Sequence, residues 1–106
     1  MNKKDEIQNK MIDKVFQTWK DYLKYEKSDI PDKVIIKEIK DNFKLGLNGV
    51  ENELDKLRDE FDKINKDHPY YEDLDILWDL LNHYKDYLSG TMTKSFIDEE
   101  IKYYSI

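Results

Sequence analysis

The residues best suited to acid–base or metal chemistry are the two histidines, His68 and His83. They are too far apart for an HExxH zinc motif, and no Glu-x-x-His pair of the di-iron type is present. Asp79 precedes His83 by one helical turn, but two ligands seldom suffice to hold a metal ion. We therefore expect no metal site, and we interpret each histidine as a helix cap or a surface residue.

Other catalytic groups are also missing. The chain has no cysteine, which excludes disulfides, thiolate metal sites and thiol catalysis. The three glycines are scattered, so there is no phosphate-binding loop, and no serine lies in a nucleophile-elbow motif. Glu99 and Glu100 are adjacent and would diverge by about 100° on a helix, so they cannot grip one substrate together. We therefore expect no enzymatic activity and no cofactor.

The elements that carry these residues are predicted to be helices, because apolar residues recur every three or four positions. The predicted helices cover about 3–27, about 31–45, 49 to about 66, and 70–88, followed by a short helix after Thr91 or Thr93. Proline at 31 and 69 marks helix starts. The connections are short, which favours antiparallel neighbours. The sequence therefore predicts one all-α domain over 1–106, a compact antiparallel bundle of four to five helices.

Each predicted helix has one apolar face. The inward residues are expected to be Ile7, Met11, Val15, Trp19, Tyr22 and Tyr25; Ile36, Ile39 and Phe43; Val50, Leu54, Leu57, Phe61 and Ile64; Tyr70, Leu74, Leu77, Leu81, Tyr84 and Leu88; and Phe96 or Ile97, Ile101 and Tyr104. The third and fourth sets alternate steps of three and four, which is a heptad seam.

The boundary between the second and third helices has two interpretations. Gly46 suits a left-handed helix end followed by a contact from Leu47, and Asn48 with Glu51 resembles a capping box. These residues predict a tight break. The alternative is one continuous helix over 31–66, because the apolar spacing continues through Leu47 and Val50.

Composition limits the class of protein. Charged residues make up 40% of the chain and aromatic residues 13%, and the aromatic share argues against a disordered chain. No apolar run could span a bilayer, and the charged N-terminus leads into no signal-peptide core, so we expect a cytoplasmic protein with no membrane partner. The absence of alanine beside many residues with AT-rich codons suggests a low-GC bacterium, its phage or a mobile element.

Negative charge gathers in one part of the chain. Residues 51–80 contain eleven acidic and four basic residues, an excess larger than the net charge of −6. Helical spacing places two acidic rows on outer faces, and these are Glu51, Asp55, Asp59 and Asp62, followed by Glu72, Asp75 and Asp79. Like charges one turn apart cost a few tenths of a kcal/mol each, roughly. The acidic rows therefore have two interpretations. They form either a solvated face or a binding surface for a partner protein that supplies the basic residues.

Aromatic residues lie beside the seams as well as on them. Tyr71 and Trp78 are seven positions apart, and Tyr103 is next to the seam residue Tyr104. Partly exposed Tyr and Trp are enriched in binding hot spots, although they also cover the edges of helical bundles. Tyr71 and Trp78 therefore join the seven acidic residues as candidate partner-binding residues.

These features predict a small inhibitor that binds a protein with a basic surface, possibly a nuclease, in place of nucleic acid. Anti-CRISPR proteins of phages are of this kind, although no motif of such a protein is present. Direct binding of nucleic acid is not expected, because phosphate contacts need Lys and Arg, and the chain has one Arg. The alternatives are an immunity protein for a bacterial toxin or bacteriocin, and a structural homodimer or phage assembly subunit. The oligomeric state stays open.

Overall fold

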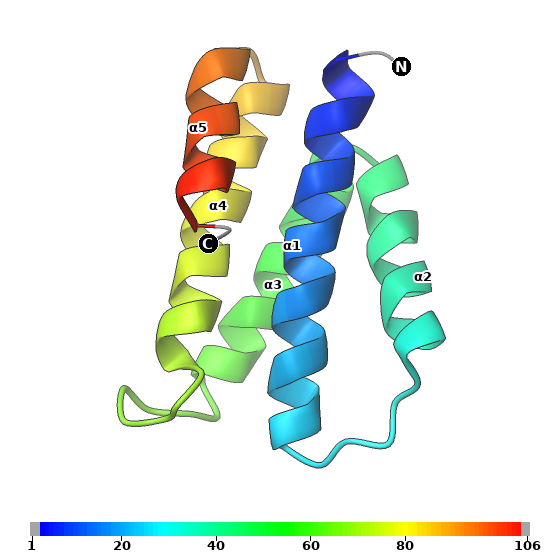
Figure 1. The fold of residues 1–106 in the computed structure, drawn as a ribbon, viewed down its shortest axis with the longest axis vertical. Helices are drawn as coiled ribbons and strands as arrows, with labels where there is room; N and C mark the ends of the chain where they lie inside the picture. The colour runs from blue at the N-terminus through cyan, green and yellow to red at the C-terminus, as the bar shows by residue number, and fades with distance from the viewer. Residues whose placement is uncertain (1–2, 105–106) are drawn as a thin grey trace.

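The computed structural model describes residues 3–104 and contains five helices (Figure 1). These are α1 (Lys3–Tyr25), α2 (Asp32–Lys44), α3 (Leu47–Phe61), α4 (Tyr71–Leu88) and α5 (Lys94–Tyr104). Figure 1 shows that successive helices run in opposite directions. Each helix packs on the next, and α1 also contacts α4 and α5. The prediction of an all-α bundle of four to five helices is confirmed.

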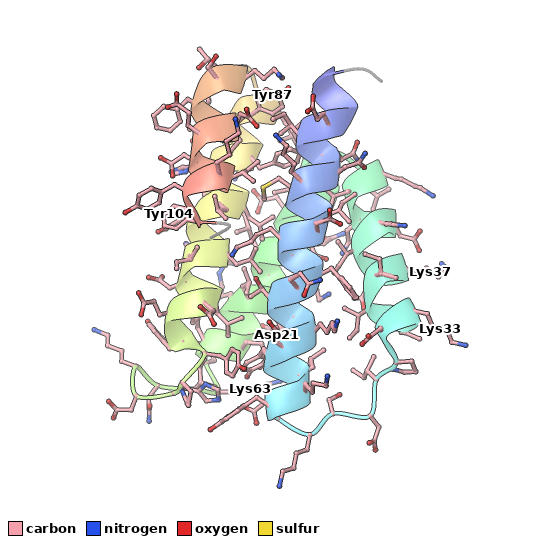
Figure 2. The ribbon with its side chains drawn as sticks, in the orientation of Figure 1. Asp21, Lys33, Lys37, Lys63, Tyr87 and Tyr104 are labelled. Carbon is pink, nitrogen blue, oxygen red and sulfur yellow. The ribbon has the colours of Figure 1, made fainter. Side chains whose placement is uncertain are left out.

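The apolar faces form one core. Its fully buried members include Ile7, Met11 and Val15 of α1, Ile39 of α2, Leu54 and Leu57 of α3, Leu74, Leu77, Leu80 and Leu81 of α4, and Ile97 of α5. Figure 2 shows Lys33 and Lys37 projecting outward from α2, away from the other helices. Within the described residues, no helix has the length and apolar character needed to cross a bilayer.

One predicted inward position is wrong, Tyr25 of α1, and a second, Ile36 of α2, packs only at the edge of the core. Helix α1 ends at Tyr25 instead of Lys27, and the Tyr25 side chain is half exposed. Lys27 adopts a positive φ of 60°, and the Ser28 amide donates to the Leu23 carbonyl, so the chain reverses here without a glycine. On α2, Ile35 is the buried residue with Ile39 and Phe43, while Ile36 lies at the edge. The contacts of α2 with both α1 and α3 determine this rotation.

The break between the second and third helices is confirmed, but its chemistry differs from the prediction. Gly46 is the residue before α3 and has a positive φ of 65°, which favours glycine. Helix α3 begins at Leu47, so Asn48 is already helical and forms no capping box. The Leu47 side chain is 41% exposed, so Leu47 is not part of the buried core.

Gly49 has a separate role that spacing along the chain did not reveal. It is buried inside α3, and a Cβ atom at this position would overlap the backbone carbonyl of Asn42 in α2. Glycine therefore permits the two helix backbones to approach each other closely.

The remaining boundaries are close to those expected. Helix α3 ends at Phe61 instead of Lys66, although Ile64 in the following loop still packs on the core. Helix α5 begins after Thr93, whose hydroxyl accepts the Phe96 amide at 3.2 Å. Ile97 is the buried residue of the predicted pair, and Phe96 is 47% exposed.

Two lysines of α1 tie α5 to the bundle. The Lys10 ammonium lies 2.6 Å from the Asp98 carboxylate, and the Lys14 ammonium donates to the Tyr104 carbonyl at 2.7 Å. The Lys10 hydrogen bond lowers the pKa of Asp98, because it favours the charged carboxylate.

Candidate protein-binding surface

The nine residues predicted to bind a partner lie on α3 and α4 or directly after α3. These are Glu51, Asp55 and Asp59 on α3, Asp62 after its end, and Tyr71, Glu72, Asp75, Trp78 and Asp79 on α4. Six of the seven carboxylates are exposed, and Glu51 is partly exposed. The two helices are antiparallel neighbours, so the end of α3 lies beside the start of α4 (Figure 1).

Tyr71 and Trp78 lie at the edge where α3 meets α4. Their rings contact Phe61 of α3 with centroid distances of 5.4 Å and 6.2 Å, and both remain partly exposed. The guanidinium of Arg58 lies 5.6 Å from the Trp78 ring centre, in cation–π geometry. The aromatic residues therefore pack against α3 at the bundle edge and leave part of each ring exposed.

Two of the carboxylates are paired, which corrects the expectation that this acidic row faces only itself. Asp55 binds Arg58 at 3.0 Å, one turn further along α3. Glu51 forms an ion pair with Lys85, which comes from α4. The second pair was invisible in the sequence because it joins two helices.

The other five carboxylates, Asp59, Asp62, Glu72, Asp75 and Asp79, make no ion pair within the part of the chain that the structure describes. They do not all face one way. Asp59 borders a cleft between α1, α2 and α3. Asp79 faces α5, where burial and then the charges of Glu100, Tyr103 and Asp79 raise the pKa of Tyr104.

The structure therefore assembles a smaller surface than the sequence predicted. Asp75 shares one face of α4 with Tyr71 and Trp78, at steps of four and three. Asp62 follows Phe61, against which Tyr71 packs. We call Asp62, Tyr71, Glu72, Asp75 and Trp78 the α3–α4 surface. Asp59 and Asp79 lie outside it, and Glu51 and Asp55 are the paired carboxylates further back along α3.

Glu53 is a buried carboxyl whose place in the core its spacing in the sequence did not indicate. Its side chain is fully buried between α2 and α3, where Asn42 donates a hydrogen bond to it. The Lys56 ammonium lies 3.5 Å from Glu53 and 3.2 Å from Glu38. Burial raises the pKa of the Glu53 carboxyl against the opposing effects of Lys56 and Asn42. Its position next to the seam residue Leu54 was the only hint in the sequence that Glu53 could be buried. Spacing along α3 does not show which side of that helix faces α2.

Each of the two histidines connects two elements of the fold. The Tyr70 amide donates to His68 Nδ1 at 3.0 Å, and His68 Nε2 lies 2.6 Å from Glu26, so His68 holds the α3–α4 loop to the end of α1. His83 lies 3.7 Å from Glu100 of α5. Among the side chains that the structure describes, no group of three His, Asp or Glu residues could hold a metal ion.

The α3–α4 surface offers carboxylates beside partly exposed aromatic rings. These groups favour cations on a protein partner, through charge pairing and cation–π contact. No family model, curated protein sequence or solved structure matches this chain.

Proposed function

We propose that this chain is a non-enzymatic inhibitor whose α3–α4 surface covers a basic, nucleic-acid-binding surface of another protein. One observation carries the proposal. Three exposed carboxylates, Asp62 directly after α3 and Glu72 and Asp75 on α4, make no ion pair among the described residues and accompany the partly buried rings of Tyr71 and Trp78.

The carboxylates would act in two ways. They would occupy the place of phosphates against Lys and Arg of the partner, and they would speed the encounter by charge steering. Exposed ion pairs alone add little affinity, since each is worth about 0–1 kcal/mol. Most of the binding energy would therefore come from the two aromatic rings, because Tyr and Trp dominate interface hot spots.

The same surface argues against direct binding of nucleic acid. Phosphate contacts require free cations, and the single arginine, Arg58, is already paired with Asp55 and stacked on Trp78. A nucleic-acid-handling enzyme in the cytoplasm, such as a nuclease of a bacterial defence system, has the complementary surface. The proposal thus retains an anti-CRISPR-like role for this chain.

The test compares two triple charge reversals with the same change in net charge. The first is Asp62→Lys, Glu72→Lys and Asp75→Lys in the α3–α4 surface, and the control is Asp13→Lys, Asp21→Lys and Glu99→Lys on α1 and α5, where these carboxylates are also exposed. Both variants should fold, because surface changes usually alter stability by less than about 0.5 kcal/mol per site.

Immobilised wild-type chain should retain a basic protein from a bacterial lysate, and added duplex DNA or RNA should release it. The control variant should retain it equally, and the first variant should not. Equal retention by the two variants would show that the α3–α4 surface is not the interface. If excess nucleic acid does not release the retained protein, this chain does not bind that protein's nucleic-acid-binding surface.

A further inference from the structure

Helix α2 carries a row of exposed lysines that the proposed function does not use. They are spaced by four, three and four positions, so they lie along one face of the helix, and they are Lys33, Lys37, Lys40 and Lys44. Lys37 pairs with Asp41 at 2.7 Å, while the other three make no ion pair among the described residues. We call these four residues the α2 lysine row.

Exposed apolar side chains accompany this row. Val34 is 47% exposed and lines an open hollow of about 540 Å³ together with Lys33 and Lys37. Leu45, directly after α2, is 59% exposed. This side of α2 therefore combines unpaired cations with aliphatic groups. It is the chemical counterpart of the α3–α4 surface, where unpaired carboxylates accompany partly exposed rings.

These two complementary surfaces are separated within one chain. Helix α2 packs on α1 and α3, and in the described part of the chain it makes no contact with α4. Four of the five residues of the α3–α4 surface belong to α4. Figure 1 shows α2 and α4 on opposite flanks of the bundle. Pairing of the two surfaces with each other therefore requires two copies of the chain.

We infer that the α2 lysine row of one copy binds the α3–α4 surface of a second copy. The lysines would approach Asp62, Glu72 and Asp75, and the aliphatic groups would contact the rings of Tyr71 and Trp78. Because the contact joins two different surfaces, it is head-to-tail and extends into an open chain of copies. The inference shares the α3–α4 surface with the proposed function, and self-association would compete with the basic partner for it.

The dimensions of α2 indicate a weak, reversible contact. Its 13 residues form a cylinder about 20 Å long and about 10–12 Å wide, so one face covers roughly a few hundred Å². Stable interfaces bury about 800 Å² on each partner. Each copy also has a net charge of −6, so whole chains repel one another. Salt at about 0.1 M screens this repulsion beyond about 10 Å, while charges in direct contact still attract.

Sedimentation of the purified chain in about 0.1 M salt tests the inference. The average mass should rise above that of a monomer between micromolar and millimolar concentration, and about 1 M salt should reverse the rise, because it screens even close pairs. The α2 reversal, Lys33→Glu, Lys40→Glu and Lys44→Glu, should remain monomeric.

A matched control separates the row from net charge. Lys24→Glu, Lys27→Glu and Lys102→Glu change three exposed lysines outside α2 and give the same net charge as the α2 reversal. This control should still associate at millimolar concentration, because its α2 lysine row is intact.

Mixing two variants tests the pairing of the surfaces directly. The α3–α4 reversal, Asp62→Lys, Glu72→Lys and Asp75→Lys, should not associate alone, because both of its surfaces are basic. The α2 reversal has two acidic surfaces. An equimolar mixture restores the original contact between the intact row of one variant and the intact α3–α4 surface of the other, so the mass should rise again. This rescue would also show that both variants are folded.

The inference is overturned if the wild-type chain stays monomeric, if the α2 reversal associates as its control does, or if mixing restores nothing. It is also overturned if the α2 lysine row binds anionic lipid vesicles or duplex DNA while the chain stays monomeric. The proposed function is tested separately, because the α2 reversal keeps the α3–α4 surface and should still retain the basic protein from a lysate. A chain that self-associates but retains no such protein would contradict the proposed function alone.

Discussion

Helix α3 is held on its two sides by different means. Toward α4 the contact is made by large apolar and aromatic groups, including Phe61 against Tyr71 and Trp78. Toward α2 it is made by a small residue and a polar group, Gly49 and the buried Glu53. One helix can therefore be held by the packing of large side chains on one side and by close backbone approach on the other.

The largest expected effect is on the apolar side. Leu77 of α4 is completely buried in the core, so Leu77→Ala removes methyl groups and leaves a cavity. We expect a loss of about 2–5 kcal/mol in the free energy of unfolding, measured by urea denaturation. A loss of less than about 0.5 kcal/mol would show that α4 does not depend on this seam.

A smaller but still large effect is expected where α3 meets α2. Gly49→Ala adds a methyl group that would overlap the Asn42 carbonyl, and backbone cannot move aside as a flexible side chain can. Overpacking typically costs about 1–3 kcal/mol. As a control, Gly90→Ala meets no neighbouring atom and would instead report backbone strain, because Gly90 has a φ of 84°. If Gly49→Ala costs nothing, the two helices are further apart than the structure indicates.

Helical seams and close approaches differ in how far sequence can predict them. The seams of α3 and α4 follow from spacing within one helix, so Leu54, Leu57, Leu74 and Leu77 were predicted correctly. The role of Gly49 depends on a carbonyl seven residues away on another helix, and the exchange of Ile36 for Ile35 depends on how α2 rotates between two neighbours.

The candidate site divides in the same way. Exposure of the acidic rows followed from helical spacing, because the seams determine which faces point outward. Helical spacing could not predict which carboxylates form ion pairs, because Lys85 reaches Glu51 from another helix. The packing of Trp78 on Phe61 also depends on the register between α3 and α4, which spacing within each helix leaves undetermined.

The smallest predicted effect has the opposite sign and again concerns the α2 side. Glu53→Gln keeps an oxygen that can accept from Asn42 but removes the buried charge. We expect a rise of a few degrees in Tm at neutral pH, roughly what 1 kcal/mol produces in a domain of this size. The gain arises because the charged form of Glu53 is disfavoured by burial.

The pH dependence provides the control for this variant. Burial raises the pKa of Glu53 in the folded state, so below the unfolded pKa the carboxyl is protonated in both states and costs nothing. As pH rises from the unfolded pKa through the raised folded pKa, the unfolded state loses its proton first and the wild type loses stability. The advantage of Glu53→Gln should therefore grow with pH over this window. An advantage that is equally large in acid would assign the effect to packing instead of charge.

The order in which the helices contact one another also has a kinetic consequence. Helices α2, α3, α4 and α5 each pack on a neighbour in the chain, and only α1 must meet α4 and α5 across a long stretch of sequence. Chains rich in local contacts fold in microseconds to milliseconds, and the long-range closure carries most of the entropic cost. Trp19 lies on α1 and Trp78 on the α3–α4 hairpin. Single-tryptophan variants can therefore time the local hairpin and the long-range docking of α1 as separate fluorescence signals during refolding.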